Sequence, residues 1–235
     1  MSDPQPDWFY DEFRQVGVDY NSIEEVERYD RDASPIRKLN EEVAHITGAI
    51  NLKEDHTVLE FGCGTGEVTI ELAKRCRKVI AVDVAQRMID YAALKALERG
   101  IGNIDFVCSG FLNIERPDRE IDAIVTELAL HHLPEFWKMI AIRRMYDLLK
   151  TGGRLYLMDI ILSFDVGHYR AAMDEMVQFT NKFAGPNKAR EMVLNLKEEY
   201  PSFDWVIEAM LLKAGFKVDS IIRYNGYFAV FVATK

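Results

Sequence analysis

The chain has 235 residues, of which 49% are hydrophobic and 29% charged, and this length and composition suit one α/β domain with a full apolar core. Its formal net charge of −9 argues against a nucleic-acid partner, because an acidic protein repels polyanions. No segment approaches the apolar length of a membrane span.

Cysteine use points to a reducing compartment. The chain has three cysteines, Cys63, Cys76 and Cys108, and no pair of them has CxxC spacing. Neither a disulfide framework nor a structural zinc site is therefore expected. We expect a cytoplasmic monomer or homodimer without a bound metal ion. Its expected partner is a small-molecule substrate, not a nucleic acid or a membrane.

The first predicted elements precede a glycine-rich turn. Residues 1–33 mix polar and aromatic side chains and are expected to form a cap segment. Ser34-Pro35 is a typical helix start, with serine as the N-cap and proline as the first helical residue. The helix that follows is predicted to end at Gly48.

From residue 58 onward, strands alternate with helices. Apolar runs and helical spacing predict strands at 58–61, 78–84, 104–110, 121–129 and 154–161 and helices at 66–76, 85–100 and 134–150. Gly100 and Gly152-Gly153 are expected to close two of these helices. The alternation predicts βαβ units and a parallel sheet, with residues 34–162 as the cofactor-binding core.

The pattern changes after residue 162. Residues 163–202 show two helical runs around Gly185-Pro186 and are predicted as a helical cap insertion. Residues 203–235 follow as a last helix and two β-rich runs around Asn225-Gly226, the strongest short signal for a hairpin. We therefore predict a single-domain α/β fold. Its Rossmann-like, doubly wound sheet is mostly parallel, and the C-terminal hairpin adds an antiparallel strand.

The stretch VLEFGCGTGEV at residues 58–68 is a strand followed by a glycine-rich turn, which is typical of a nucleotide-cofactor site. A dinucleotide fingerprint is GxGxxG, whose third glycine lets the helix pack close to the strand. Here Gly62 and Gly64 fit, but Glu67 stands at the third position and the next glycine is Gly66. No GxxxxGK[ST] motif occurs, which excludes a P-loop.

Two acids narrow the choice of cofactor. Glu60 precedes the glycines and would repel a pyrophosphate, which binds backbone N–H groups at a helix start. Asp83 ends the next strand, where a carboxylate can accept hydrogen bonds from both hydroxyls of a ribose. An acid for an ammonium group, glycines for close approach and an acid for a ribose together suggest S-adenosylmethionine.

These motifs, in this order, resemble those of class I S-adenosylmethionine-dependent methyltransferases over residues 35–162 and the final hairpin. The resemblance rests on ExGxGxG from Glu60 to Gly66, Asp83, TELALHHLPE at 126–135 and KTGGRLYLMD at 150–159. It implies a seven-stranded sheet with one antiparallel strand. The cofactor-binding residues assigned on this basis are Glu60, Gly62, Cys63, Gly64, Gly66, Asp83, Val84, Met88, Ser109, Gly110, Phe111 and Glu127.

The segment after the third strand departs from the family. The family often has Gly-Asp-Ala there, with the acid reaching the adenine amino group, whereas this chain has Ser109, Gly110 and Phe111. Either Ser109 or the backbone is therefore expected to contact the adenine, or Phe111 packs on its ring.

Methyl transfer from a sulfonium is an in-line displacement that depends on alignment and on exclusion of water. A hydroxyl or carbon acid also needs a general base, whereas a nitrogen nucleophile needs only to be unprotonated. His131, just past the fourth strand, is the predicted base, in preference to His132 and with Asp159 as another candidate. Tyr29 and Tyr169, in the two segments expected to close over the site, are predicted to face the substrate.

Two alternatives remain open. A methyltransferase acting on RNA or protein is disfavoured because TELA stands where an NPPY-like tetrapeptide would follow the fourth strand. The other alternative is a NAD-dependent oxidoreductase or a non-catalytic nucleotide-binding protein. The sequence does not distinguish an oxygen, nitrogen, carbon or sulfur acceptor, because this fold hosts many acceptors.

Overall fold

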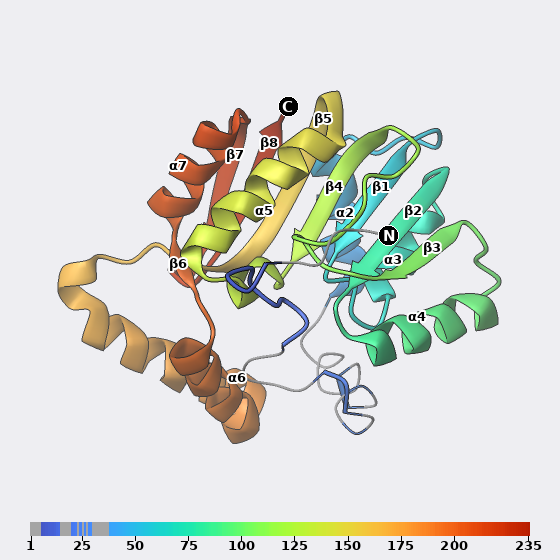
Figure 1. Cartoon of the computed structure of the whole chain (residues 1–235). Coiled ribbons are helices and arrows are strands. Elements are labelled where there is room, and N and C mark those ends of the chain that lie inside the picture. Colours follow the sequence, from blue (N-terminus) through green and yellow to red (C-terminus); the bar gives the residue numbers. More distant parts are fainter. Residues whose placement is uncertain (1–5, 15–19, 23, 25, 27, 30–37) are drawn as a thin grey trace.

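The computed structural model describes residues 6–14, 20–22, 24, 26, 28–29 and 38–235, which Figure 1 shows as a coloured cartoon. The predicted helix start at Ser34-Pro35 lies outside these residues. The first complete helix, α2, spans Leu39–Ala49 and includes Gly48, so its predicted end is wrong by one residue. The left-handed residue after this helix is Asn51, with φ of 51°.

A central sheet confirms the predicted fold class. Its strands follow the order β3-β2-β1-β4-β5-β8-β7, and only β8 runs against its neighbours. A two-residue strand, β6 (Ser202–Phe203), pairs with β5 and is an addition to the seven expected strands. The seven longer strands are β1 Thr57–Phe61, β2 Lys78–Asp83, β3 Ile104–Cys108, β4 Ile121–Glu127, β5 Leu149–Leu162, β7 Lys217–Tyr224 and β8 Phe228–Thr234.

Helices cover both faces of the sheet (Figure 1). They are α3 Glu67–Ala73, α4 Gln86–Glu98, α5 Glu135–Leu148 and α7 Asp204–Ala214, together with α2. Side chains alternate between the faces along each strand. Leu59 and Phe61 therefore join the apolar cluster under α5 and α7, whereas Val58 joins the cluster under α2 and α3.

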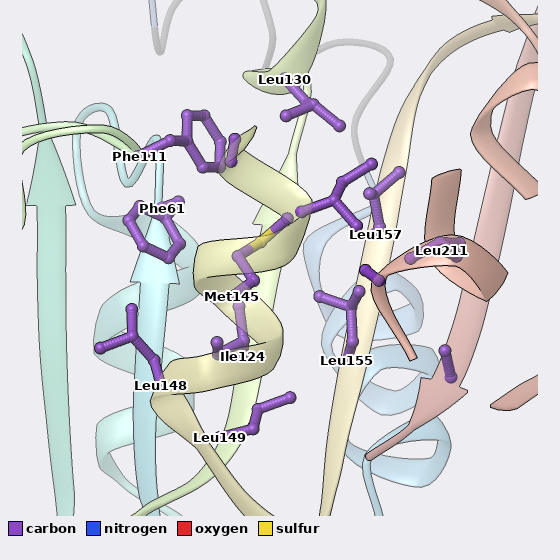
Figure 2. Packing of buried hydrophobic residues seen from close by; sticks show 14 of the residues in the cluster. Phe61, Phe111, Ile124, Leu130, Met145, Leu148, Leu149, Leu155, Leu157 and Leu211 are labelled. Carbon is purple, nitrogen blue, oxygen red and sulfur yellow. The ribbon is translucent and has the colours of Figure 1, made fainter. Parts of the chain in front are cut away.

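The larger apolar cluster reaches the end of β1. Figure 2 shows Met145 of α5 between Phe61 and Phe111 on one side and Leu155 and Leu157 of β5 on the other. The rings of Phe61 and Phe111 stack with centroids 4.6 Å apart. This packing fixes the carboxyl end of β1, where the glycine turn begins.

The passage from α5 to β5 differs from the prediction. The helix ends at Leu148 and the strand begins at once at Leu149, so Gly152-Gly153 lies inside β5 and does not close the helix. The backbone N–H of Gly152 donates to the carbonyl of Lys235 at 2.9 Å, and Lys235 donates back to Gly153 at 3.0 Å. Pairing with the end of β8 thus draws the glycine pair into the sheet.

The predicted insertion is largely one long helix, α6 (Tyr169–Glu198), which follows a short 3₁₀ helix, η2 (Val166–His168). The helix breaks at Gly185, whose φ of 86° is not helical, just before Pro186. Figure 1 shows α6 and the N-terminal segment (blue) beyond the same edge of the sheet. In the part of the chain that the structure describes, no helix is both long and apolar enough to cross a membrane.

Candidate functional site

A pocket opens at the carboxyl ends of the parallel strands. It lies where the strand order reverses, between β1 and β4, which is the usual ligand site of an open α/β sheet. The residues that line it are Tyr10, Glu12, Arg14, Tyr20, Tyr29, Phe61, Gly62, Gly64, Val82, Asp83, Val84, Met88, Ser109, Gly110, Phe111, Glu127, Leu128, Ala129, His132 and Leu133. Most of the cofactor residues predicted from the sequence are among them.

The glycines of the turn after β1 are required by backbone conformation and by close packing. Gly62, Gly64 and Gly66 have φ of 70°, 51° and 81°, a region that other residues rarely adopt. A Cβ on Gly62 would lie 2.4 Å from the Cβ of Ala129, and one on Gly66 would lie 2.9 Å from the Cβ of Ala92. Gly62 thus lets the β1 turn meet the β4 loop, and Gly66 lets α3 meet α4.

Asp83 connects the glycine turn to the end of β2. Its carboxylate accepts hydrogen bonds from the backbone N–H of Gly64 and of Ala85, both at 2.9 Å. Burial raises the pKa of Asp83, and these backbone hydrogen bonds oppose the rise. Each carboxylate oxygen keeps a lone pair with which it can accept a further hydrogen bond from a ligand.

Three of the predicted cofactor residues do not line the pocket. Glu60 lies within β1 and is 5% exposed, with Ala81 and Val125 as its neighbours on the adjacent strands. Cys63 packs into the apolar cluster under α2 and α3, and Gly66 contacts α4. These three residues support the glycine turn on the side away from the pocket. A direct contact of Glu60 with the cofactor stays a prediction.

The carboxylate of Glu12, in the N-terminal segment, lies beside Gly110, the position after β3 where the family often has an acid. A Cβ on Gly110 would lie 2.3 Å from Cδ of Glu12 and 2.4 Å from its Oε2. The Glu12 carboxylate accepts hydrogen bonds from the backbone N–H of Leu112 at 2.9 Å and of Asn113 at 3.0 Å, and from the Asn113 side chain at 2.7 Å. Burial raises the pKa of Glu12, and these hydrogen bonds oppose the rise.

The N-terminal segment, residues 6–14 and the described residues of 20–29, covers the pocket with aromatic side chains. The rings of Tyr20 and Tyr29 meet edge to face at 6.1 Å, and Tyr20 meets the ring of His132 at 6.2 Å. The ring of Tyr29 also comes within 3.9 Å of the place where a Cβ on Gly64 would lie. Tyr29 is therefore at the pocket, as predicted for a substrate-side residue, whereas its role there stays a prediction.

The other predicted substrate residue lies elsewhere. Tyr169, at the start of α6, is 50% exposed and does not line the pocket. Among the described residues, none from 163–202 lines it. The segment that covers the pocket is therefore the N-terminal one, and α6 instead packs its buried Met176 with Leu162 and Tyr227 beside the end of β5.

His131, the predicted base, lies behind the pocket. Its Nδ1 is 2.5 Å from Asp159 Oδ1, and its Nε2 is 3.1 Å from Glu199 Oε2. Burial would lower the pKa of His131, but the two carboxylates outweigh it and raise the pKa to about 9. A histidine whose two ring nitrogens both face carboxylates has no nitrogen directed at a substrate, so this geometry does not support the base role.

His132 is the histidine that lines the pocket. Burial, and then the charge of His131, lower its pKa to about 4, which keeps its imidazole neutral. Its Nδ1 lies 3.7 Å from Glu199 Oε1. Both histidines lie in the 3₁₀ helix η1 (Leu130–His132), and the sequence alone does not give the direction of their side chains.

Sequence comparison relates the chain to methyltransferases. Residues 58–153 match a family described as a methyltransferase domain. A Bacillus cereus protein described as an uncharacterized methyltransferase is 31% identical over 178 residues, covering 76% of this chain and 77% of that protein. A second such protein, from Bacillus subtilis, is 29% identical over 146 residues, or 61% of this chain. The chain spans about half the length of that relative, 54%.

Solved structures share the fold. A SAM-dependent methyltransferase from Aquifex aeolicus aligns with a TM-score of 0.64 and 21% identity, over 92% of this chain and 98% of that one. At this level of identity the likeness concerns the arrangement of strands and helices alone.

Proposed function

This chain belongs to the class I S-adenosylmethionine-dependent methyltransferases, and on that premise we propose that it methylates a small-molecule acceptor in the cytoplasm. The observation that carries the proposal is the position of the N-terminal segment, whose Tyr10, Tyr20 and Tyr29 line the pocket. A pocket covered by the chain itself suits a small acceptor better than a folded macromolecule. The net charge of −9 and the three free cysteines agree with this proposal.

The pocket residues fit S-adenosylmethionine. Gly62 and Gly64 leave the turn open to a ligand, and Asp83 lies beside them with lone pairs available for the ribose hydroxyls. Glu12 Oε2 lies where a side chain on Gly110 would project. We propose that Glu12 accepts the adenine amino group's hydrogen bond in place of the family's acid.

S-adenosylmethionine supplies an electrophilic methyl group, and the neutral thioether that leaves needs no proton. The chain's own residues therefore act by binding, alignment and exclusion of water. Glu127, Leu128 and Ala129 form the β4 side of the pocket. Leu128 has φ of 51°, and its N–H donates to the carbonyl of Met158 at 2.9 Å. Backbone strain held in this way is typical of functional sites.

The residue at the start of α3 argues against the alternative of a NAD-dependent oxidoreductase. Glu67, which replaces the third glycine of the dinucleotide fingerprint, pairs with Lys95 and Arg99, each at 2.9 Å. A pyrophosphate bound at this helix start would meet a fixed carboxylate. The Glu67 side chain therefore links α3 to the end of α4 by ion pairs. The dinucleotide fingerprint has a glycine at this position.

A label-transfer assay tests the proposal. The protein is incubated with methyl-labelled S-adenosylmethionine and a metabolite-containing lysate, and small molecules are then separated from protein and nucleic acid. We expect the label in the small-molecule fraction, and much less of it with Asp83→Asn, which keeps the side chain's size but removes its charge. Label in protein or RNA would contradict the small-molecule acceptor.

A further inference from the structure

Three potential metal ligands meet at the edge of the pocket. His131 and His132 come from η1, and Glu199 follows α6 in the chain. One ligand atom from each residue lies within 4.8 Å of the other two. Two imidazoles and one carboxylate are a common ligand set for a divalent transition metal with open coordination positions.

The carboxylate of Glu199 is buried beside two imidazoles. Its side chain is 1% exposed, and among the described residues neither of its oxygens has a hydrogen-bond partner of good geometry. A buried carboxylate is unfavourable unless a positive charge compensates it, and the single ring of His131 lies between two buried carboxylates, Asp159 and Glu199. Both oxygens face imidazoles, at 3.1 Å from His131 Nε2 and 3.7 Å from His132 Nδ1.

These separations suit donors that share one ion. Two ligands bound at about 2.0–2.2 Å to a tetrahedral zinc lie about 3.4 Å from each other. The two observed separations fall on either side of that value. The ligand atoms of all three residues lie within 4.8 Å of one another, so an ion placed among them would draw the two rings closer together.

Asp159 supplies the outer partner that a metal-binding histidine usually has. Its Oδ1 is 2.5 Å from His131 Nδ1, and its Oδ2 accepts the backbone N–H of His131 at 3.0 Å. This contact turns His131 Nε2 toward Glu199. A carboxylate on the far nitrogen fixes the tautomer and raises the basicity of the ligating nitrogen.

We propose that His131 Nε2, His132 Nδ1 and the Glu199 carboxylate bind one divalent transition metal ion of the zinc class. Its charge balances Glu199 and Asp159. His132 lines the pocket, so an open coordination position faces the pocket and takes a water molecule or an oxygen atom of the acceptor. The part concerning the acceptor rests on the proposed function, whereas metal binding does not. The site departs from the expectation that the chain holds no metal.

Zinc titration of the chelator-treated, full-length protein tests the site in the absence of cofactor and acceptor. We expect one zinc ion per chain, and cobalt in its place should give the visible absorption of a low-symmetry site with nitrogen ligands. His132→Ala and Glu199→Gln should each lower the zinc affinity at least 100-fold. Asp159→Asn should lower it about 10- to 100-fold.

Two exposed residues of the same types serve as matched controls. His168→Ala and Glu198→Gln repeat the same substitutions at exposed positions and should leave zinc affinity unchanged. Circular dichroism identifies any variant that fails to fold. Wild-type protein that binds no stoichiometric zinc would overturn the proposal and leave His131 as an imidazolium between two carboxylates. A failed label-transfer assay, in contrast, would leave the zinc titration unaffected.

Discussion

The glycine turn and the N-terminal segment enclose the same pocket by different means. The turn is built from backbone, and its contacts to Asp83, Ala92 and Ala129 are made within about 70 residues of chain. The N-terminal segment acts through side chains, and Glu12 reaches its partner Leu112 across a separation of 100 residues. Substitutions in the turn should therefore affect folding, and those in the segment should affect ligand affinity.

The largest expected effect is that of Gly62→Ala on stability. The left-handed backbone costs an alanine about 1–2 kcal/mol, and the overlap with Ala129 adds about 1–3 kcal/mol. We expect the free energy of unfolding to fall by about 2–5 kcal/mol, measured as a lower urea midpoint. Gly100→Ala is the control, because Gly100 has the same φ of 70° but no atom within 4 Å of its missing side chain. Equal losses in the two variants would show that close packing does not matter at Gly62.

The second-largest expected effect is the loss of cofactor affinity when the Glu12 carboxylate is removed. Glu12→Ala should weaken S-adenosylmethionine binding by about 1.5–3 kcal/mol, the usual value of a hydrogen bond to a charged group, as measured by calorimetry. Asp7→Asn, an exposed change in the same segment, should have no effect.

A second substitution sharpens this test. Gly110→Asp alone should weaken binding, because its Cβ would overlap the Glu12 carboxylate. Combined with Glu12→Ala it should restore affinity, since the acid then returns to the position that the family uses. If the double variant binds no better than the worse single variant, Glu12 does not replace that acid.

The smallest effect concerns the helix that begins at the turn. Burial would raise the pKa of Glu67, but hydrogen bonds and charges of Arg99 and Lys95 outweigh it and lower the pKa from 4.5. The ionised form therefore stabilises the fold above about pH 4.5, and this contribution is lost as the pH falls through the lowered pKa.

Urea unfolding at pH 7 and pH 3 measures this contribution. Wild-type protein should lose about 0.5–1 kcal/mol more than Glu67→Gln over this range. Glu98→Gln, at the exposed end of α4, should behave like wild type. An identical pH dependence in all three proteins would mean that the contact between α3 and α4 contributes nothing measurable.

Sequence patterns predicted what depends on local chain order. The strands from β1 to β5, the hairpin around Asn225-Gly226 and the positions of Gly62, Gly64 and Asp83 at the pocket all follow from periodicity and turn chemistry. The passage at Gly152-Gly153 was mispredicted because pairing with Lys235 overrides the local helix-stop signal.

Long-range placement could not be predicted in the same way. Nothing in the residues around Glu12 indicates a partner at Asn113, although Gly110 in place of an acid marked the position that needed one. The directions of His131 and His132 depend on Asp159 and Glu199, which come from different elements. No local pattern fixes which of two adjacent histidines faces a pocket.

The contact of Glu12 with Leu112 and Asn113 also couples two equilibria: the docking of the N-terminal segment onto the pocket, and the binding of a ligand in it. The carboxylate belongs to the N-terminal segment, and the turn it contacts forms part of the pocket. Any factor by which a ligand favours the docked position of residues 6–14 must return as the same factor in that ligand's affinity. During synthesis this contact cannot form until residue 113 has emerged, and the pocket is complete only after Leu133 has followed.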